Sequence, residues 1–191
     1  MTLDRMMETR TMTTNHRQCF RVSSWLMGLL TLALLLGATP SGQAQSADGI
    51  KVAFIYNFSR FVKWPKGTVD GSFKVGFVGD TPLKSLFARS VKGKNAGGKP
   101  FEIVDLSGAS GAEACQIVFV ADAAKASEII GALKDKPVMT IGNDAGFADS
   151  GGVVGFVTGK KVTFHLNLGA AESGKIKVDT KLQKIAVKVK S

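Results

Sequence analysis

Short apolar runs alternate with segments of helical character along most of the chain, and this alternation limits the possible folds more than any other feature. Residues 117–120 are continuously apolar, which is typical of a central strand covered on both faces. Further strands are predicted at residues 73–78, 101–106 and 138–141. Strands and helices that alternate in this way favour a mostly parallel sheet with helices on both faces.

Helix signals separate these strands. Thr81 is suited to cap a helix and Pro82 to occupy its first position, so a helix is predicted through about residue 90. A second helix is predicted at residues 123–133 and one helical turn at residues 144–149. Residues 153–157 and 161–168 flank a glycine-containing turn and predict an antiparallel hairpin at one side of the sheet. The tail, residues 176–189, has apolar side chains at helical spacing beside a lysine face. We therefore expect a single α/β domain.

The first 44 residues have the features of a cleaved signal peptide. Arginines precede an apolar run of 12 residues, which is too short to span a bilayer comfortably, and Gly42-Gln43-Ala44 fits a cleavage site. Met6, Met7 or Met12 remains open as the true start. We expect residues 45–191 to form the mature domain and to reside in the periplasm.

Charge and cysteine content restrict the function of this mature part. It holds 21 Lys and Arg against 13 Asp and Glu, a net charge of +8. This balance favours acidic protein partners or phospholipid headgroups, and the predicted export argues against nucleic acid. Cys115 is its one cysteine, so no internal disulfide is expected. Because Cys115 precedes an apolar strand, a buried, inert thiol is expected rather than a nucleophile.

The motifs of catalysis and cofactor binding are missing from the sequence. The glycine turn from Gly76 to Pro82 lacks the G-x-G-x-x-G pattern and has an aspartate where a phosphate would lie. His165 is the only histidine of the mature part, too few for a metal centre with Cys115, and no G-x-S-x-G nucleophile motif occurs. We expect no enzymatic activity, no cofactor and no metal.

Candidate contact residues lie in and near the aromatic segment A-F-I-Y-N-F-S-R-F-V-K-W-P, residues 53–65. Its phenylalanines, at positions 54, 58 and 61, predict a helix packed on the sheet, capped at Asp48 and ended by Pro65. Core packing does not require the polar and amphipathic side chains of this segment. Arginine and amphipathic aromatic residues are good interface anchors. The predicted partner-binding residues are Tyr56, Arg60, Trp64, His165, Leu182 and Ile185.

The sequence resembles the YfiR family of small exported regulators. The aromatic segment is similar to the family's Y-N-F…F-x-x-W-P helix, and F-K-V-G-F-V-G-D-T-P, C-Q-I-V-F-V and V-M-T-I-G-N-D-A-G-F-A-D-S-G-G-V-V-G-F follow in matching order. The strand V-T-F-H-L-N-L stands in place of the family's usual F-x-I-N-L ending. The resemblance covers nearly the whole mature chain.

This resemblance implies a repressor that holds an inner-membrane diguanylate cyclase in check through the cyclase's exported sensor domain. It also implies that an outer-membrane lipoprotein can sequester the repressor, and that cyclic di-GMP and biofilm formation are controlled. A homodimer is possible. With Cys115 alone, a redox switch based on internal disulfides cannot operate here. The alternative is a sensor of a small periplasmic ligand that feeds a membrane kinase or cyclase, with Trp64 and the loops at residues 144–152 lining its pocket.

Overall fold

The computed structural model describes residues 46–191, so the predicted leader and its cleavage site lie outside the described residues. The first helix, α2, spans Ala47–Phe61. Its N-cap is Ser46, whose Oγ accepts a hydrogen bond from the Gly49 N–H at 3.1 Å. The predicted cap, Asp48, instead lies in the first turn, where a negative charge is favourable.

Helix α2 ends before the predicted stop at Pro65. Val62 is extended, with φ −110° and ψ 140°, and Val62–Lys63 forms strand β1. This strand pairs antiparallel with β9, Lys177–Val178, in a separate two-stranded sheet. Pairing with a distant segment therefore ends the helix, and no signal for it is present in the local sequence.

The main sheet has eight strands in the order β10-β8-β7-β6-β5-β2-β4-β3. The strands β2, β4, β5, β6 and β7 all run parallel, in the spatial order of doubly wound flavodoxin-like folds. This confirms the predicted α/β class. The strands of the sheet are β2 (Phe73–Val78), β3 (Asn95–Ala96), β4 (Lys99–Leu106), β5 (Ile117–Val120), β6 (Met139–Gly142), β7 (Val154–Thr158), β8 (Val162–Asn167) and β10 (Lys188–Lys190).

In the C-terminal part of the sheet, the predicted hairpin is present but the predicted helical tail is not continuous. Strands β7 and β8 form the predicted antiparallel hairpin. The tail does not continue as one helix: α7 covers only Thr180–Ile185, and β10 follows it as an edge strand parallel to β8. The helical spacing of apolar residues in the tail thus runs across two different elements.

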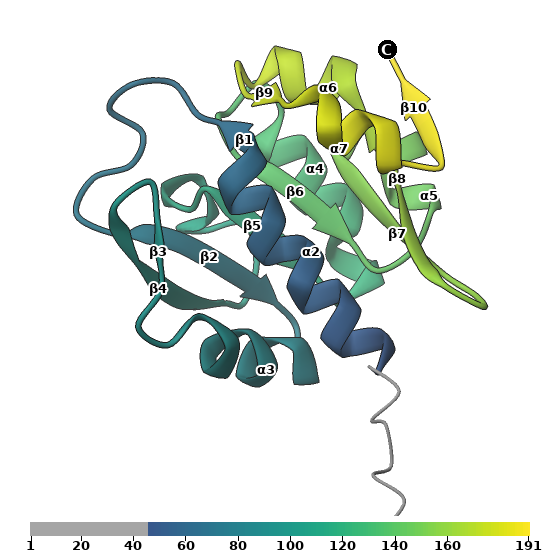
Figure 1. The fold of residues 1–191 in the computed structure, drawn as a ribbon. Helices are drawn as coiled ribbons and strands as arrows, with labels where there is room; N and C mark the ends of the chain where they lie inside the picture. Colours follow the sequence, from purple (N-terminus) through teal and green to yellow (C-terminus); the bar gives the residue numbers. More distant parts are fainter. Residues whose placement is uncertain (1–45) are drawn as a thin grey trace, which may run out of the picture. The chain divides into compact units, whose positions relative to one another are not determined.

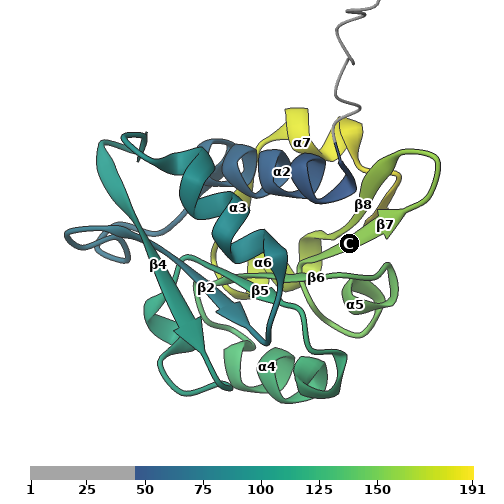
Figure 2. The ribbon, with the colours of Figure 1, turned by 90° about the horizontal axis from the view of Figure 1, so that it is seen from below.

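Helices cover both faces of the sheet, as predicted (Figures 1 and 2). Helices α2, α3 and α7 lie on one face, and α4 and α5 lie on the other (Figure 2). The predicted cap of α3 is confirmed, because Oγ1 of Thr81 accepts a hydrogen bond from the Leu83 N–H and Pro82 follows at the first position. The bounds are α3 (Pro82–Val91), α4 (Ala126–Leu133), α5 (Gly146–Asp149) and α6 (Leu168–Ser173), with short 3-10 turns at Ala112–Ala114 and Ala123–Lys125.

Strand β5 separates two apolar cores, because its side chains alternate between the two faces of the sheet. Phe119 lies in the core beneath α2 and α3, whereas Val118 and Val120 lie in the core beneath α4. Phe58 of α2 is fully buried in the first core, and burial of such a side chain contributes about 1.5–3 kcal/mol. Phe54, which was predicted to share this buried stripe, is only half-buried.

Val52 and Ile55 complete the buried stripe of α2 with Phe58, whose predicted burial is confirmed. Phe61, the third predicted core phenylalanine, is also half-buried. Within residues 46–191, no helix is both long and apolar enough to cross a membrane.

Candidate functional site

Tyr56 and Arg60 lie one turn apart on α2, as their spacing requires. The guanidinium carbon of Arg60 is 5.9 Å from the centroid of the Tyr56 ring, and Nζ of Lys94 is 4.9 Å from it. Both cations therefore contact the electron-rich ring. Phe101 of β4 supports the ring from the sheet, at 5.9 Å between centroids. Tyr56 is half-buried, while Arg60 and Lys94 are exposed.

Trp64 is held in place by the sheet and is not a free surface anchor. Its ring meets Phe73 edge to face, with centroids 5.0 Å apart, and its Nε1–H donates a hydrogen bond to the Gln116 carbonyl at 3.1 Å. The buried Gln116 side chain accepts from the Lys74 N–H at 2.7 Å and donates to the Thr68 carbonyl at 2.6 Å. Gln116 thus fixes the segment that follows β1, and with it the position of Trp64.

A groove of about 430 Å³ opens beside these residues. Arg60 and Lys99 are the charged residues of its wall, and the wall contains no carboxylate. The half-buried ring of Trp64 adds aromatic surface, whereas Phe73 is only 2% exposed. This basic and aromatic lining suits an acidic or aromatic group from a partner. The lining residues are Ser59, Arg60, Val62, Trp64, Val69, Phe73, Asn95, Ala96, Gly97 and Lys99.

The other three predicted contact residues do not join this groove. Leu182 is only 2% exposed and belongs to the core beneath α2, so it offers no free surface, contrary to our expectation for the tail. Ile185, at the end of α7, is 54% exposed. His165 is paired in register with Lys188 of β10, and its Nδ1 is buried without a hydrogen-bond partner.

His165 therefore lies on the opposite face of the sheet from Tyr56. Its neighbours on β8, Phe164 and Leu166, face the core beneath α2, and successive side chains of a strand alternate between faces. The six predicted residues therefore do not form one site. One group, at α2 and just after it, contains Tyr56, Arg60 and Trp64. Leu182 lies in the core, and His165 and Ile185 lie in the C-terminal part of the chain.

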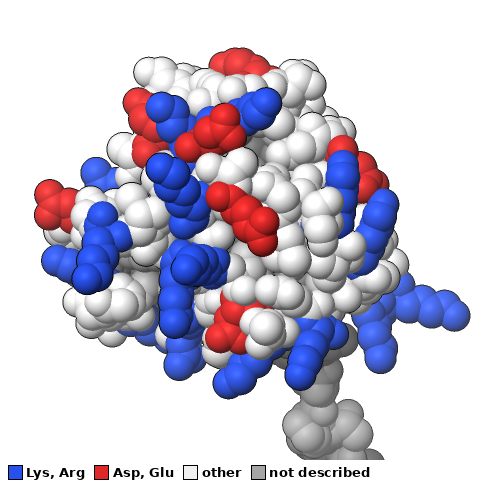
Figure 3. Space-filling model, turned by 90° about the horizontal axis from the view of Figure 1, so that it is seen from above, with Lys and Arg blue, Asp and Glu red and all other residues white. Residues whose placement is uncertain are grey.

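Sequence reasoning missed the exposed apolar side chains in the last strand and just before it. Val187 is 64% exposed and Val189 is 42% exposed, although the tail pattern predicted that Val189 would belong to a helix face. Basic side chains extend over much of the side of the molecule that carries α6, α7 and β9 (Figure 3). Acidic side chains lie between them, so this face is mixed in charge rather than uniformly positive (Figure 3).

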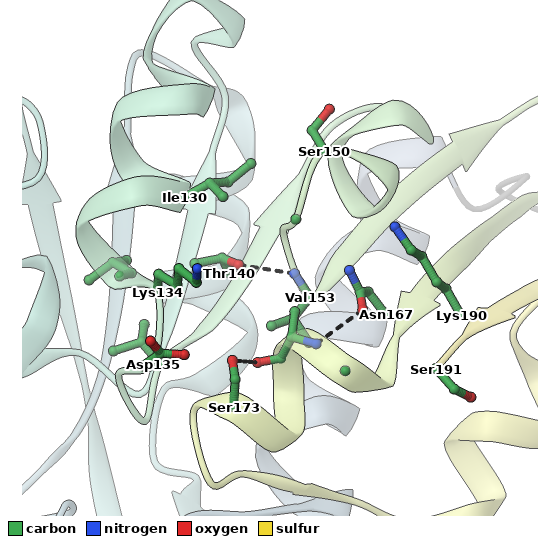
Figure 4. Close-up of a pocket in the computed structure, with 15 residues that line it drawn as sticks. Ile130, Lys134, Asp135, Thr140, Ser150, Val153, Asn167, Ser173, Lys190 and Ser191 are labelled. Carbon is green, nitrogen blue, oxygen red and sulfur yellow. Dashed lines mark hydrogen bonds between the residues drawn. The ribbon is translucent and has the colours of Figure 1, made fainter.

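A cavity of about 510 Å³ lies between α4, α6 and the C-terminal residues (Figure 4). Ser150 and Gly151, from the loops considered for a ligand pocket, line it, but Trp64 does not. The structure therefore does not assemble the predicted combination of Trp64 with these loops. The charged residues of the wall are Lys134, Asp135 and Lys190.

The polar groups at the floor of this cavity are already paired within the protein. Thr140 Oγ1 accepts from the Val153 N–H at 3.0 Å (Figure 4). Asn167 donates to the Ala148 carbonyl at 3.0 Å and accepts from the Ala170 N–H at 3.0 Å. The cavity therefore favours no particular class of ligand.

Cys115 is buried as predicted, with 1% of its surface exposed, and is a free thiol. Burial raises the pKa of this thiol to about 11, an effect that the charge of Lys74 partly offsets. A thiol with so high a pKa is a poor nucleophile near neutral pH.

The crevice in which doubly wound folds usually bind phosphate groups is narrow here. That crevice lies beyond the carboxyl ends of β2 and β5, where the strand order reverses. Gly79, with φ +87°, follows β2, and a Cβ at this position would come within 2.9 Å of Cβ of Asp122. The two loops thus touch, and Asp122 adds a carboxylate at the point of contact.

Comparisons with known proteins agree with this architecture. A solved structure, titled as a conserved domain protein from Vibrio cholerae O1 biovar eltor, is similar with a TM-score of 0.53 and 11% sequence identity. The match covers 73% of this chain and 60% of that chain, and at this identity it shows the fold alone. A search of curated proteins found no match. The YfiR/HmsC-like family matches residues 48–187, which confirms the resemblance seen in the sequence. The chain belongs to the YfiR/HmsC-like family.

Proposed function

We propose that this protein is a non-enzymatic periplasmic regulator that binds the exported sensor domain of an inner-membrane diguanylate cyclase and inhibits the enzyme. The observation that carries this proposal is the family match over residues 48–187, which spans nearly all of the described domain. By holding the cyclase inactive, the protein would lower cyclic di-GMP and limit biofilm formation.

The groove at the end of α2 supports a protein–protein contact. Arg60 is exposed at its wall, and the Tyr56 ring contacts both Arg60 and Lys94. An arginine beside an ordered aromatic ring loses little conformational freedom on binding, and such pairs often dominate interface energies. The cations favour an acidic patch on the partner.

Two further partners follow from the same proposal. A sensor kinase with an exported domain is an alternative target of the same kind. An outer-membrane lipoprotein that sequesters this protein would release the cyclase. Neither partner requires a nucleotide to contact this chain.

The proposal is tested by deleting the gene in a strain whose cyclase is intact and measuring cellular cyclic di-GMP. We expect the level to rise on deletion and to fall again when the wild-type chain is restored. The variant Arg60→Glu should fail to restore repression, because it opposes an acidic partner with a negative charge. The matched control is Arg89→Glu, an exposed arginine on α3, which should repress normally. A deletion strain with unchanged cyclic di-GMP would refute the proposed function.

A further inference from the structure

All three large apolar side chains that are exposed in residues 46–191 lie within one five-residue segment. They are Ile185, Val187 and Val189, with 54%, 64% and 42% of their surfaces exposed. Single exposed apolar residues are common on protein surfaces, but a contiguous group marks a contact site. The segment begins at the end of α7 and continues through β10.

The same segment presents a free strand edge. Strand β10 is the last strand of the eight-stranded sheet, and its one neighbour in the described part of the chain is β8. Backbone N–H and C=O groups alternate between the two sides of a strand, so β10 directs part of its backbone away from the sheet. Such an edge can accept a further strand through main-chain hydrogen bonds.

The charges of the segment select its partner. Lys184, Lys188 and Lys190 lie among the apolar residues, and no aspartate or glutamate occurs from residue 180 to residue 191, although Lys188 pairs with Asp149. Lysines on an edge strand oppose pairing with an identical edge, because like charges would then face one another. A second copy of this chain is thus disfavoured on this edge, and an acidic segment is favoured.

We infer that the free edge of β10 accepts an extended, acidic segment of another polypeptide, which adds a strand to the sheet. The inference rests on the proposed function, since that segment would belong to the regulated partner. A polypeptide fits better than a lipid surface because the exposed backbone of β10 requires hydrogen-bond partners, which acyl chains cannot supply.

The register of β10 predicts the pattern of the bound segment. Val189 is aligned with Leu166 and so faces the side of the sheet covered by α2 and α7. Lys188 is aligned with His165 and faces the other side, where its Nζ lies 2.8 Å from Asp149 Oδ1. A strand that alternates apolar with acidic residues would place its apolar side chains beside the valines. Its acidic side chains would lie beside Lys190 and beside Lys188, where they would compete with Asp149.

The direct test is hydrogen exchange of the mature chain with short synthetic peptides. A peptide that alternates valine and glutamate should slow exchange in β10 roughly tenfold when present at about ten times its Kd. A valine–lysine peptide should have no effect. The valine–glutamate peptide N-methylated at every residue should also have none, because neither of its edges can then donate hydrogen bonds to β10. Equal protection by all three peptides, or by none, would overturn the inference.

Two other occupants of this edge are distinguished with the same protein. Sedimentation that shows a dimer lost in Val187→Asp/Val189→Asp would assign the edge to a second copy, against the inference. Loss of binding to phosphatidylglycerol vesicles in this variant, without any peptide effect, would assign the edge to a membrane, also against it. Both substituted side chains are exposed, and an unchanged melting curve verifies that the variant folds.

A cellular measurement separates this inference from the proposed function. The chain with Val187→Asp/Val189→Asp should fail to lower cyclic di-GMP in the deletion strain, whereas Lys92→Glu, at an exposed position after α3, should repress like the wild type. If the wild type represses and the valine variant does too, the inference fails and the proposed function stands. If the wild type itself does not repress, the proposed function fails, and the peptide experiment alone decides what binds the edge.

Discussion

The ammonium group of Lys51 donates a hydrogen bond to Oδ1 of Asn143 at 2.8 Å, across 92 positions of sequence. Lys51 is on α2 and is only 6% exposed, whereas Asn143 follows β6 and is exposed. The bond joins the first helix to the carboxyl edge of the sheet. A buried ammonium is costly unless it is paired, so the loss of Asn143 and the loss of Lys51 should have different effects on stability.

We expect Asn143→Ala to destabilise the domain more than Lys51→Met. The first variant leaves a buried charge without its acceptor, which costs about 1–3 kcal/mol or more. The second removes the charge and retains an apolar stem, while the exposed Asn143 amide can bind water. Urea unfolding of the two variants measures the difference, and a larger loss in Lys51→Met would contradict this account.

Two glycines enclose the ring of Phe147. A Cβ at Gly142 would come within 2.1 Å of Phe147 Cγ, and one at Gly152 within 2.1 Å of Phe147 Cε1. We expect Gly142→Ala to lower the free energy of unfolding by about 1–3 kcal/mol, because the ring is buried and cannot yield freely. The control is Gly131→Ala in α4, where nothing lies within 4 Å and alanine should stabilise the helix by roughly 0.5–1 kcal/mol. Thermal unfolding should therefore shift in opposite directions for the two variants.

The thiol of Cys115 should resist modification while the protein is folded. Its pKa of about 11, raised by burial, leaves on the order of a thousandth of the thiol ionised at pH 8. We expect iodoacetamide to label the native chain very slowly and the urea-unfolded chain readily. Ser85→Cys, which places a thiol on exposed α3, is the matched control and should react at once. Rapid labelling of native Cys115 would show that the segment before β5 opens frequently.

The hydrogen bond from Lys188 lowers the pKa of the Asp149 carboxyl. The contribution of this pair to stability is therefore fully present above the ordinary aspartate pKa of about 3.9 and is lost as the pH falls through the lower folded value. In Lys188→Ala, we expect the Asp149 pKa to return toward about 3.9, as followed by NMR titration. Both side chains are exposed, so added salt should weaken the effect in the wild type.

Much of the fold was predictable because its central strands are visible in the sequence. Ile117–Val120 is buried on both faces, and a continuous apolar run signals this environment. The end of α2 was not predictable, because β1 is defined by pairing with β9 far along the chain. The prediction of a helical tail was wrong for a similar reason. Leu182, Ile185 and Val189 are spaced as in a helix, yet the last of them lies in a strand defined by β8.

The candidate site was only partly predictable. Tyr56 and Arg60 are four positions apart, so their contact follows from helix geometry. The approach of Lys94 to the same ring depends on how the loop after α3 lies over the sheet, and no local pattern encodes it. The free edge of β10 was missed altogether, since an edge is a property of the assembled sheet and not of three residues.

The contact between Gly79 and Asp122 has a consequence for how a signal can reach this protein. In folds with this strand order, charged ligands usually bind in the crevice at the carboxyl ends of the strands, where the strand order reverses. Here Gly79 and Asp122 are in contact at that point, so we expect a signal to reach the protein through contacts on its outer surface. The substitution Gly79→Ala would force the two loops apart and would show whether the crevice between them can still open.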